Sequence, residues 1–323
     1  MERDIVEACA DESKSLADVL ASVLQNRRVH PSLLWRLFGA DDSINIEKHP
    51  VFIRLREETQ APSGVWLEMI HALAIDALHA RHWTLFETLH RYLFSFLGKR
   101  SYRVRALFAM RCEAQGNYEN AVAEYQLMLR EDPSRLLAVY RLVSIFKSQN
   151  MLEHAVLTLQ RYLHDIPSDE KAWNEALILY CELRDWTSAK YAACQRVLLL
   201  PSSAEIACTA GSVFYSAGDL KAARQYYARS IEIDVKFSTN HRPAALLGLW
   251  LTTSSLDSRG EYSNKQETEH NRRLLHWVRA ALRSLYSSLE HKQPSLSSKA
   301  MLLLLDSEQE SPEGSMSTIS DGS

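Results

Sequence analysis

Two histidines and a carboxylate stand close enough together in the sequence to suggest a metal site. His79 and His82 are three residues apart, and Asp76 lies close by. A tetrahedral site needs four ligands, usually drawn from Cys, His and carboxylates. No Cys or further His nearby completes such a set. We therefore interpret both histidines as surface or partly buried side chains and predict no metal.

Nothing else in the chain predicts catalysis. The sequence has no H-E-x-x-H, G-x-S-x-G, G-x-G-x-x-G or G-x-x-x-x-G-K-[ST] motif, each of which would supply ligands, a nucleophile or a phosphate-binding loop. The carboxylates fall mainly on expected helix faces and tails, and no nucleophile stands beside a base. We predict that the chain is not an enzyme and that it binds no cofactor.

A repeat with a period of about 34 residues dominates the middle of the chain. Alanines recur at this interval at Ala121, Ala155, Ala189 and Ala223, and prolines keep it at Pro133, Pro167 and Pro201. This is the length of the helix–turn–helix tetratricopeptide repeat. Small side chains let the paired helices approach closely, and Pro disfavours helical angles in the residue before it. The pattern predicts an all-α tetratricopeptide-repeat solenoid of antiparallel helix pairs.

The repeat divides the chain into segments. Glu87 breaks the alanine rule one period before the first match, and Asp257 breaks it one period after the last. Terminal units of solenoids commonly depart from the pattern because one side faces water. We predict an N-terminal helical extension at 1–64, a degenerate capping helix pair at 65–101, four repeats at 102–235, C-terminal capping helices at 236–293, and a short apolar segment with a disordered acidic tail at 294–323.

Within the C-terminal cap, we expect one helix over RPAALLGLWLTTSSL and a second from Arg272 to Glu290, separated by a polar loop, DSRGEYSNKQETEHN. Leu274, Val278 and Leu282 fall at helical spacing on one face of the second helix. The piece AMLLLL fits either a final helix or a docking segment.

In solenoids of this kind the first helices of the pairs line a concave groove. Some of the residues at the groove positions could equally be ordinary helix surface. Tyr140 and Tyr215 are the expected anchors, because each offers a rigid ring and a hydroxyl. The predicted partner-binding groove contains Arg103, Met110, Glu113, Leu137, Tyr140, Ser144, Lys147, Asn174, Ile178, Glu182, Cys208, Ser212 and Tyr215.

Composition and charge agree with a folded protein-binding chain. The hydrophobic fraction of 46% is ample for a core, and the 10 Gly and 9 Pro are few for 323 residues. A net charge of −3 argues against a nucleic-acid surface, which needs clustered Lys and Arg. The five cysteines form no C-x-x-C pair, which is typical of reduced thiols. The acidic start and the lack of a long apolar run predict a cytosolic chain without a membrane span.

The first repeat resembles a known family, subunit 2 of the endoplasmic reticulum membrane protein complex. Its pattern R-V-x-x-L-x-x-M-R-x-E-A, then Y-x-x-A, then L-x-x-D-P, is matched between Arg103 and Pro133. The stretches DEKAWNEA and ALLGLW agree as well. The resemblance covers about Val65 to Leu251, whereas the first sixty residues, the loop near Ser258 and the acidic tail depart from the family.

This resemblance implies a non-catalytic cytosolic scaffold, peripheral to the endoplasmic reticulum membrane. The complex inserts transmembrane segments, including tail-anchored proteins. The family's partners are the cytosolic parts of membrane subunits and a soluble, inactive metalloprotease-like subunit, through which the scaffold contacts the membrane indirectly.

A free-standing tetratricopeptide-repeat adaptor or co-chaperone is the alternative function. Co-chaperones of this type hold a terminal carboxylate with a Lys and Asn clamp. This groove has Ala106 with Met110, and Tyr140 with Ser144, at those places, which disfavours that alternative. An enzyme carrying a helical-repeat domain would need a catalytic domain, and the remaining sequence is too short and too helical for one.

Overall fold

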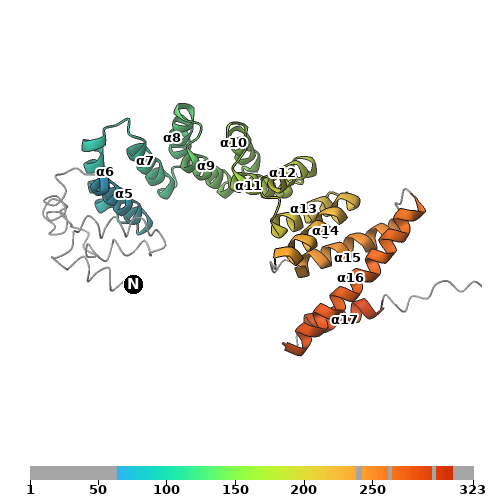
Figure 1. The fold of residues 1–323 in the computed structure, drawn as a ribbon. Helices are drawn as coiled ribbons and strands as arrows, with labels where there is room; N and C mark the ends of the chain where they lie inside the picture. Colours follow the sequence, from blue (N-terminus) through green and yellow to red (C-terminus); the bar gives the residue numbers. More distant parts are fainter. Residues whose placement is uncertain (1–63, 238–241, 261–263, 293–295, 308–323) are drawn as a thin grey trace, which may run out of the picture. The chain divides into compact units, whose positions relative to one another are not determined.

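The computed structural model describes residues 64–237, 242–260, 264–292 and 296–307. Within these ranges it consists of successive α-helices, with no β-strand (Figure 1). The helices are α5 (Gly64–His79), α6 (Trp83–Leu97), α7 (Tyr102–Ala114), α8 (Tyr118–Glu131), α9 (Leu136–Ser148), α10 (Leu152–Asp165), α11 (Glu170–Glu182), α12 (Trp186–Leu199), α13 (Ala204–Ser216), α14 (Leu220–Phe237), α15 (Arg242–Arg259), α16 (Lys265–Lys292) and α17 (Leu296–Ser307).

The chain divides into two compact units. Unit 1 ends at Thr158 and unit 2 begins at Leu159, so the boundary falls inside α10. The predicted N-terminal extension lies outside the described residues apart from Gly64, and so does the predicted acidic tail beyond Ser307.

The predicted repeats are confirmed as helix pairs. The pairs α7/α8, α9/α10, α11/α12 and α13/α14 occupy the four repeat units, and α5/α6 is a further pair before them. Ala121, Ala155, Ala189 and Ala223 each have an exposed fraction of 0%. Complete burial at every position is what a close helix crossing requires, since a larger side chain there would overpack the contact.

The turn inside each pair has a repeated backbone geometry. A residue with positive φ stands at Gly116, Asn150, Arg184 and Gly218, again one repeat period apart. The N–H of the following residue donates to a carbonyl five residues back, at 2.8–2.9 Å. This hydrogen bond is the signature of a Schellman helix end. Two of these four turns use glycine, and Asn150 and Arg184 adopt the same conformation without being glycine.

The core of unit 1 lies where α5, α6 and α7 meet. Phe86, Leu89 and Leu93 of α6 pack with Met69 and Leu73 of α5 in one hydrophobic cluster, all of them nearly or fully buried. This packing fixes the position of α5 beside α7, to which it is also joined by an ion pair of 3.3 Å between Glu68 and Arg103.

Unit 2 ends in a second hydrophobic cluster, formed by α13, α14, α15, α16 and α17. The Tyr227 ring of α14 lies between two helical glycines, Gly211 of α13 and Gly248 of α15. A Cβ added to Gly248 would lie 2.3 Å from ring atoms, and one added to Gly211 would lie 2.8 Å from them. Both glycines are thus required by the close approach of the Tyr227 ring.

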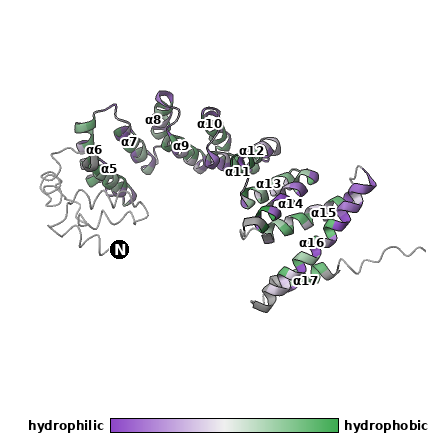
Figure 2. Cartoon of the chain, in the orientation of Figure 1, coloured by the Kyte–Doolittle hydropathy of each residue, from purple (hydrophilic) through white to green (hydrophobic). Residues whose placement is uncertain are grey.

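The polar loop between α15 and α16 is shorter than predicted, so the predicted extent is wrong. Helix α15 continues to Arg259, and α16 begins at Lys265. Gly260 ends α15 with φ 64°, and the Asn264 side chain accepts the Glu267 N–H at 2.7 Å, which caps α16. Polar residues extend both helices because those turns face solvent; Figure 2 shows hydrophilic residues along the first part of α16.

Asn271 is the exception on this polar stretch, because it is fully buried. Its amide donates to the Thr253 carbonyl of α15 at 3.0 Å and accepts from Arg224 of α14 at 3.1 Å.

The apolar piece predicted as a final helix or a docking segment forms α17. Leu305 is buried against the cluster, while Leu303 remains 70% exposed.

Candidate functional site

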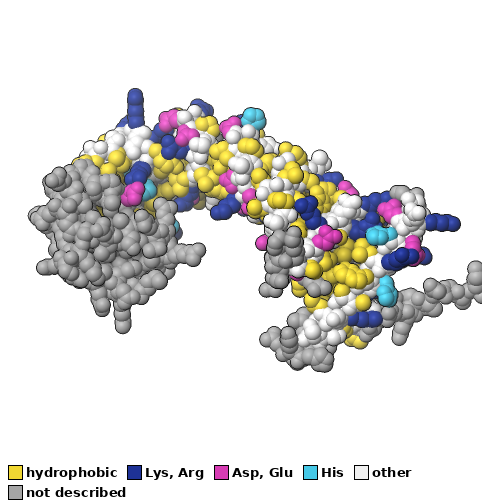
Figure 3. Space-filling model, in the orientation of Figure 1, with side chains coloured by type: hydrophobic (Ala, Val, Ile, Leu, Met, Phe, Trp, Pro, Cys, Tyr) yellow, Lys and Arg dark blue, Asp and Glu magenta, His cyan; other side chains and the backbone are white. Residues whose placement is uncertain are grey.

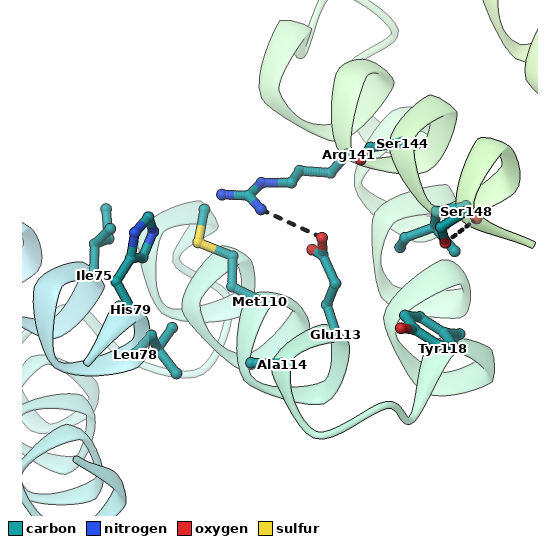
Figure 4. Close-up of a pocket in the computed structure, with 11 residues that line it drawn as sticks. Ile75, Leu78, His79, Met110, Glu113, Ala114, Tyr118, Arg141, Ser144 and Ser148 are labelled. Atoms are coloured by element: carbon teal, nitrogen blue, oxygen red, sulfur yellow. Dashed lines mark hydrogen bonds and ion pairs between the residues drawn. The ribbon is translucent and has the colours of Figure 1, made fainter. Parts of the chain in front are cut away.

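A pocket of about 330 Å³ opens in unit 1 between α5, α7, α8 and α9 (Figure 4). Most of its lining comes from α5, α7 and α9, which are the first helices of their pairs. The lining residues are Ile75, Leu78, His79, Met110, Glu113, Ala114, Tyr118, Arg141, Ser144, Ile145 and Ser148.

The base of the pocket is apolar. Leu78, Met110 and Ile145 are buried in the structure, with exposed fractions of 5%, 7% and 1%. Met110 also belongs to the hydrophobic cluster of unit 1. Because the rigid core holds these side chains, the pocket surface is formed before any partner arrives.

The polar wall of the pocket centres on Glu113. Arg141 Nη1 lies 3.3 Å from Glu113 Oε1, and the Tyr125 hydroxyl donates to Glu113 Oε2 at 3.2 Å. Burial, and then the negative charge of Glu113, raise the pKa of Tyr125 far above its ordinary value. The phenol therefore stays protonated, and both carboxylate oxygens of Glu113 have a donor within the protein.

Arg141 and His79 form the more accessible part of this wall. In Figure 4 the Arg141 side chain extends from α9 toward α5, and its guanidinium lies between His79 and Glu113. The Arg141 side chain is 35% exposed, and His79 is exposed. Among the described residues, Glu113 is the one ion-pair partner of Arg141.

The predicted groove residues of unit 1 divide between the pocket and its surroundings. Met110, Glu113 and Ser144 line it. Arg103 pairs with Glu68 on the outside of α5, and Leu137 is 37% exposed at the start of α9. Tyr140 and Lys147 are half-buried on α9, outside the pocket lining.

The remaining predicted residues lie on α11 and α13 of unit 2. Asn174 is half-buried, whereas Ile178, Glu182 and Ser212 are exposed or partly exposed. Cys208 and Tyr215 pack against the C-terminal cluster. The Tyr215 hydroxyl lies 3.4 Å from the Ser255 hydroxyl of α15. Tyr215 therefore contacts both the C-terminal cluster and α15.

Several pocket residues were not predicted from the sequence. Ile75, Leu78 and His79 come from α5, which lies outside the regular repeats and so has no place in the groove register. Arg141 follows the predicted Tyr140 directly, but it occupies a position of the first helix that was not assigned to the groove. Neighbouring positions on a helix point about 100° apart, so Arg141 lies on a different part of the α9 surface from Tyr140.

Asp76 is the most strongly perturbed acid near the pocket. It precedes the pocket residue His79 by one turn of α5, and its Oδ2 atom is buried without a hydrogen-bond partner. Burial raises the pKa of Asp76 from 3.8 to about 6. The histidine pair with Asp76 does not gain further ligands: no group of three or more His, Cys, Asp or Glu side chains able to hold a metal is found in the described part of the chain.

Two surface properties bear on the kind of partner. On the face shown in Figure 3, Lys and Arg side chains of the described residues are dispersed among acidic and hydrophobic ones. None of the described helices combines the length and apolarity that crossing a bilayer requires.

Comparison with known proteins shows what the repeats are similar to. Residues 86–210 match the model of the EMC2 TPR-like repeat domain, which confirms the resemblance drawn from the first repeat. The chain is 26% identical over 189 residues to "ER membrane protein complex subunit 2-A" of Xenopus laevis, covering 58% of this chain and 62% of that one. It is 27% identical over 222 residues to "ER membrane protein complex subunit 2" of Dictyostelium discoideum, covering 65% and 66%. The chain thus spans less than two thirds of the length of these relatives.

The fold has parallels among solved structures as well. The C-terminal part of a TPR repeat-containing protein from Cytophaga hutchinsonii superposes with a TM-score of 0.55 at 13% identity, covering 88% of this chain and 99% of that one. At this identity the likeness concerns the fold, which is the tetratricopeptide-repeat solenoid predicted from the sequence.

Proposed function

Because residues 86–210 match the EMC2 TPR-like repeat domain, we propose that this chain is a non-catalytic scaffold subunit of the endoplasmic reticulum membrane protein complex. It lies on the cytoplasmic face of the membrane and holds other subunits together. The observation that carries the proposal is the match of the repeats to this one domain, joined by relatives from a frog and a slime mould whose names state the same subunit.

The proposed partners are the cytosolic parts of membrane subunits and a soluble, inactive metalloprotease-like subunit. Helical-repeat surfaces suit this role because stacked helices present an extended face of small pockets. The pocket of unit 1, with an apolar base and a polar wall, is one such feature. The assembled complex inserts transmembrane segments, including tail-anchored proteins, and the scaffold contributes by positioning its partners.

Membrane fractionation followed by affinity purification tests the proposal. We expect the full chain to sediment with endoplasmic reticulum membranes and to be released by alkaline carbonate, which strips peripheral proteins. From membranes solubilised in mild detergent, a tagged chain should recover the other subunits of the complex. Resistance to carbonate, or recovery of chaperones without those subunits, would contradict the proposal, and the second result would favour a free-standing adaptor.

A further inference from the structure

The pocket of unit 1 has hydrogen-bond donors that its own side chains do not use. A guanidinium carries several N–H donors arranged in a planar fork. Within the described residues, Arg141 is engaged through Nη1, which lies 3.3 Å from Glu113 Oε1. The side chain is 35% exposed, so its remaining donors can be reached from outside.

The charge arrangement favours an acidic guest over a basic one. Glu113 is the acidic residue among those lining the pocket, and its two oxygens already accept from Arg141 and Tyr125. A basic guest would have to displace Arg141 from Glu113. A carboxylate guest can bind the unused donors of Arg141 while both internal contacts remain, and Arg–carboxylate pairs of this kind are short and strong.

The apolar base of the pocket favours a guest that carries an aliphatic side chain. Leu78, Met110 and Ile145 present hydrocarbon surface at the bottom of the pocket. Its volume of about 330 Å³ lies at the lower end of the roughly 300–1,000 Å³ typical of ligand pockets. This space suits a short piece of a chain with one aliphatic side chain inserted.

We propose that the pocket binds an extended segment of a partner subunit that places an aliphatic side chain on the base and a neighbouring Asp or Glu carboxylate on Arg141. Ser144 lies one helical turn beyond Arg141 on α9 and also lines the pocket, so its hydroxyl can bond the backbone of the same segment. The inference rests on the proposed function, because it names the chemistry by which the scaffold grips a partner.

Site-specific photo-crosslinking in the intact complex identifies the guest. A benzoylphenylalanine probe replaces Ser144, and a matched probe replaces Ser212, which is exposed on α13 at the equivalent repeat position two units later. We expect the first probe alone to capture a peptide of another subunit with an acid within two residues of an aliphatic side chain.

Capture at Ser144 of a basic segment, of residues 1–63 of this chain, or of nothing at all while the complex assembles normally would overturn the proposal. Failure of the wild-type chain to recover the complex would instead overturn the proposed function. The two failures are therefore distinguishable.

The captured sequence is then made as a labelled synthetic peptide. Its affinity is measured for the full wild-type chain and for full chains with a changed charge in the pocket. Arg141→Glu should lower the affinity for the peptide by roughly tenfold or more, because a charge-assisted hydrogen bond is replaced by repulsion. Arg141→Lys should restore part of the affinity. Glu113→Gln should leave the affinity equal or higher, since it frees the guanidinium.

The peptide with its acid changed to the amide serves as the matched guest and should be insensitive to Arg141→Glu. Circular dichroism melting confirms that each variant is folded. Weaker binding by Glu113→Gln than by the wild-type chain, or an equal response of the acidic and amide peptides to Arg141→Glu, would show that the pocket does not select a carboxylate.

Discussion

The Tyr227 ring provides the sharpest test of how the C-terminal helices of unit 2 are held together. It is 5% exposed and lies against Gly211 on α13 and Gly248 on α15. Gly248→Ala would place a methyl group 2.3 Å from the ring atoms Cε1 and Cζ. Because Gly211 bounds the ring as well, the ring has little room to move away.

The free-energy cost of Gly248→Ala follows from how far the added methyl group would overlap the ring. Carbon atoms normally approach to about 3.5–4.0 Å, so the added methyl would overlap the ring by roughly 1 Å or more. Forcing an extra carbon into a packed core typically costs about 1–3 kcal/mol. Replacing Gly by Ala within a helix recovers about 1 kcal/mol. Because the overlap is large, we expect a cost of about 2–3 kcal/mol, at the upper end of the first range, and so a net loss of about 1–2 kcal/mol in the free energy of unfolding of unit 2.

Denaturant unfolding of the full chain, followed by circular dichroism, measures this loss. Hydrogen exchange should show faster opening of α13, α14 and α15. Ser258→Ala, at an exposed position of α15, is the control for helix propensity. In a Tyr227→Leu background the cost of Gly248→Ala should shrink, since the ring is gone. An unchanged stability, or an equal cost in both backgrounds, would refute the packing argument.

Three further substitutions test the repeats and the perturbed acid, each by unfolding of the full chain. Ala189→Leu should lower stability by about 1–3 kcal/mol by overpacking a fully buried crossing, and retention of the wild-type midpoint would invalidate the repeat register. Arg184→Gly should raise stability by about 0.5–1 kcal/mol, because φ 57° is strained for Arg; a loss would show that the Arg side chain makes a compensating contact. The raised pKa of Asp76 means that the wild-type chain loses stability as the pH rises from 3.8 to about 6, because the buried carboxyl then ionises. Asp76→Asn should therefore unfold like the wild type below this window and be more stable above it, and a difference independent of pH would contradict the assignment.

The regular part of the fold could be predicted because the same physical demand recurs once in every repeat. A close helix crossing admits only a small side chain, and Ala121, Ala155, Ala189 and Ala223 meet that demand visibly in the sequence. Only two of the four turns have a clear signal in the sequence. Gly116 and Gly218 signal a left-handed residue, whereas Asn150 does so weakly and Arg184 gives no such signal, although the backbone is the same.

The C-terminal helices were harder to delimit because their ends are set by tertiary contacts. The stretch from Asp257 to Asn271 is polar, which favoured a loop, yet Asn271 is buried and bonded to Thr253 and Arg224. A buried amide of this kind looks like a surface residue in the sequence. Gly248 likewise gave no sign of its role, since the Tyr227 ring that requires it belongs to another helix.

The candidate pocket was predicted only in part for the same reason. Met110, Glu113 and Ser144 follow from the repeat register, but Ile75 and His79 belong to the irregular pair α5/α6. Their position beside α7 depends on the packing of the unit 1 core, which no spacing in the sequence specifies. Tyr215, predicted as an anchor of the groove, is partly buried and also packs against the C-terminal cluster.

The most direct test of the scaffold assignment is a reciprocal purification. A different subunit of the endoplasmic reticulum membrane protein complex is tagged, the membranes are solubilised in mild detergent, and the recovered proteins are quantified by mass spectrometry. We predict that this chain is recovered in a one-to-one ratio with the tagged subunit and that removing it lowers the abundance of the others. A complex of normal composition and abundance that lacks this chain would contradict the account.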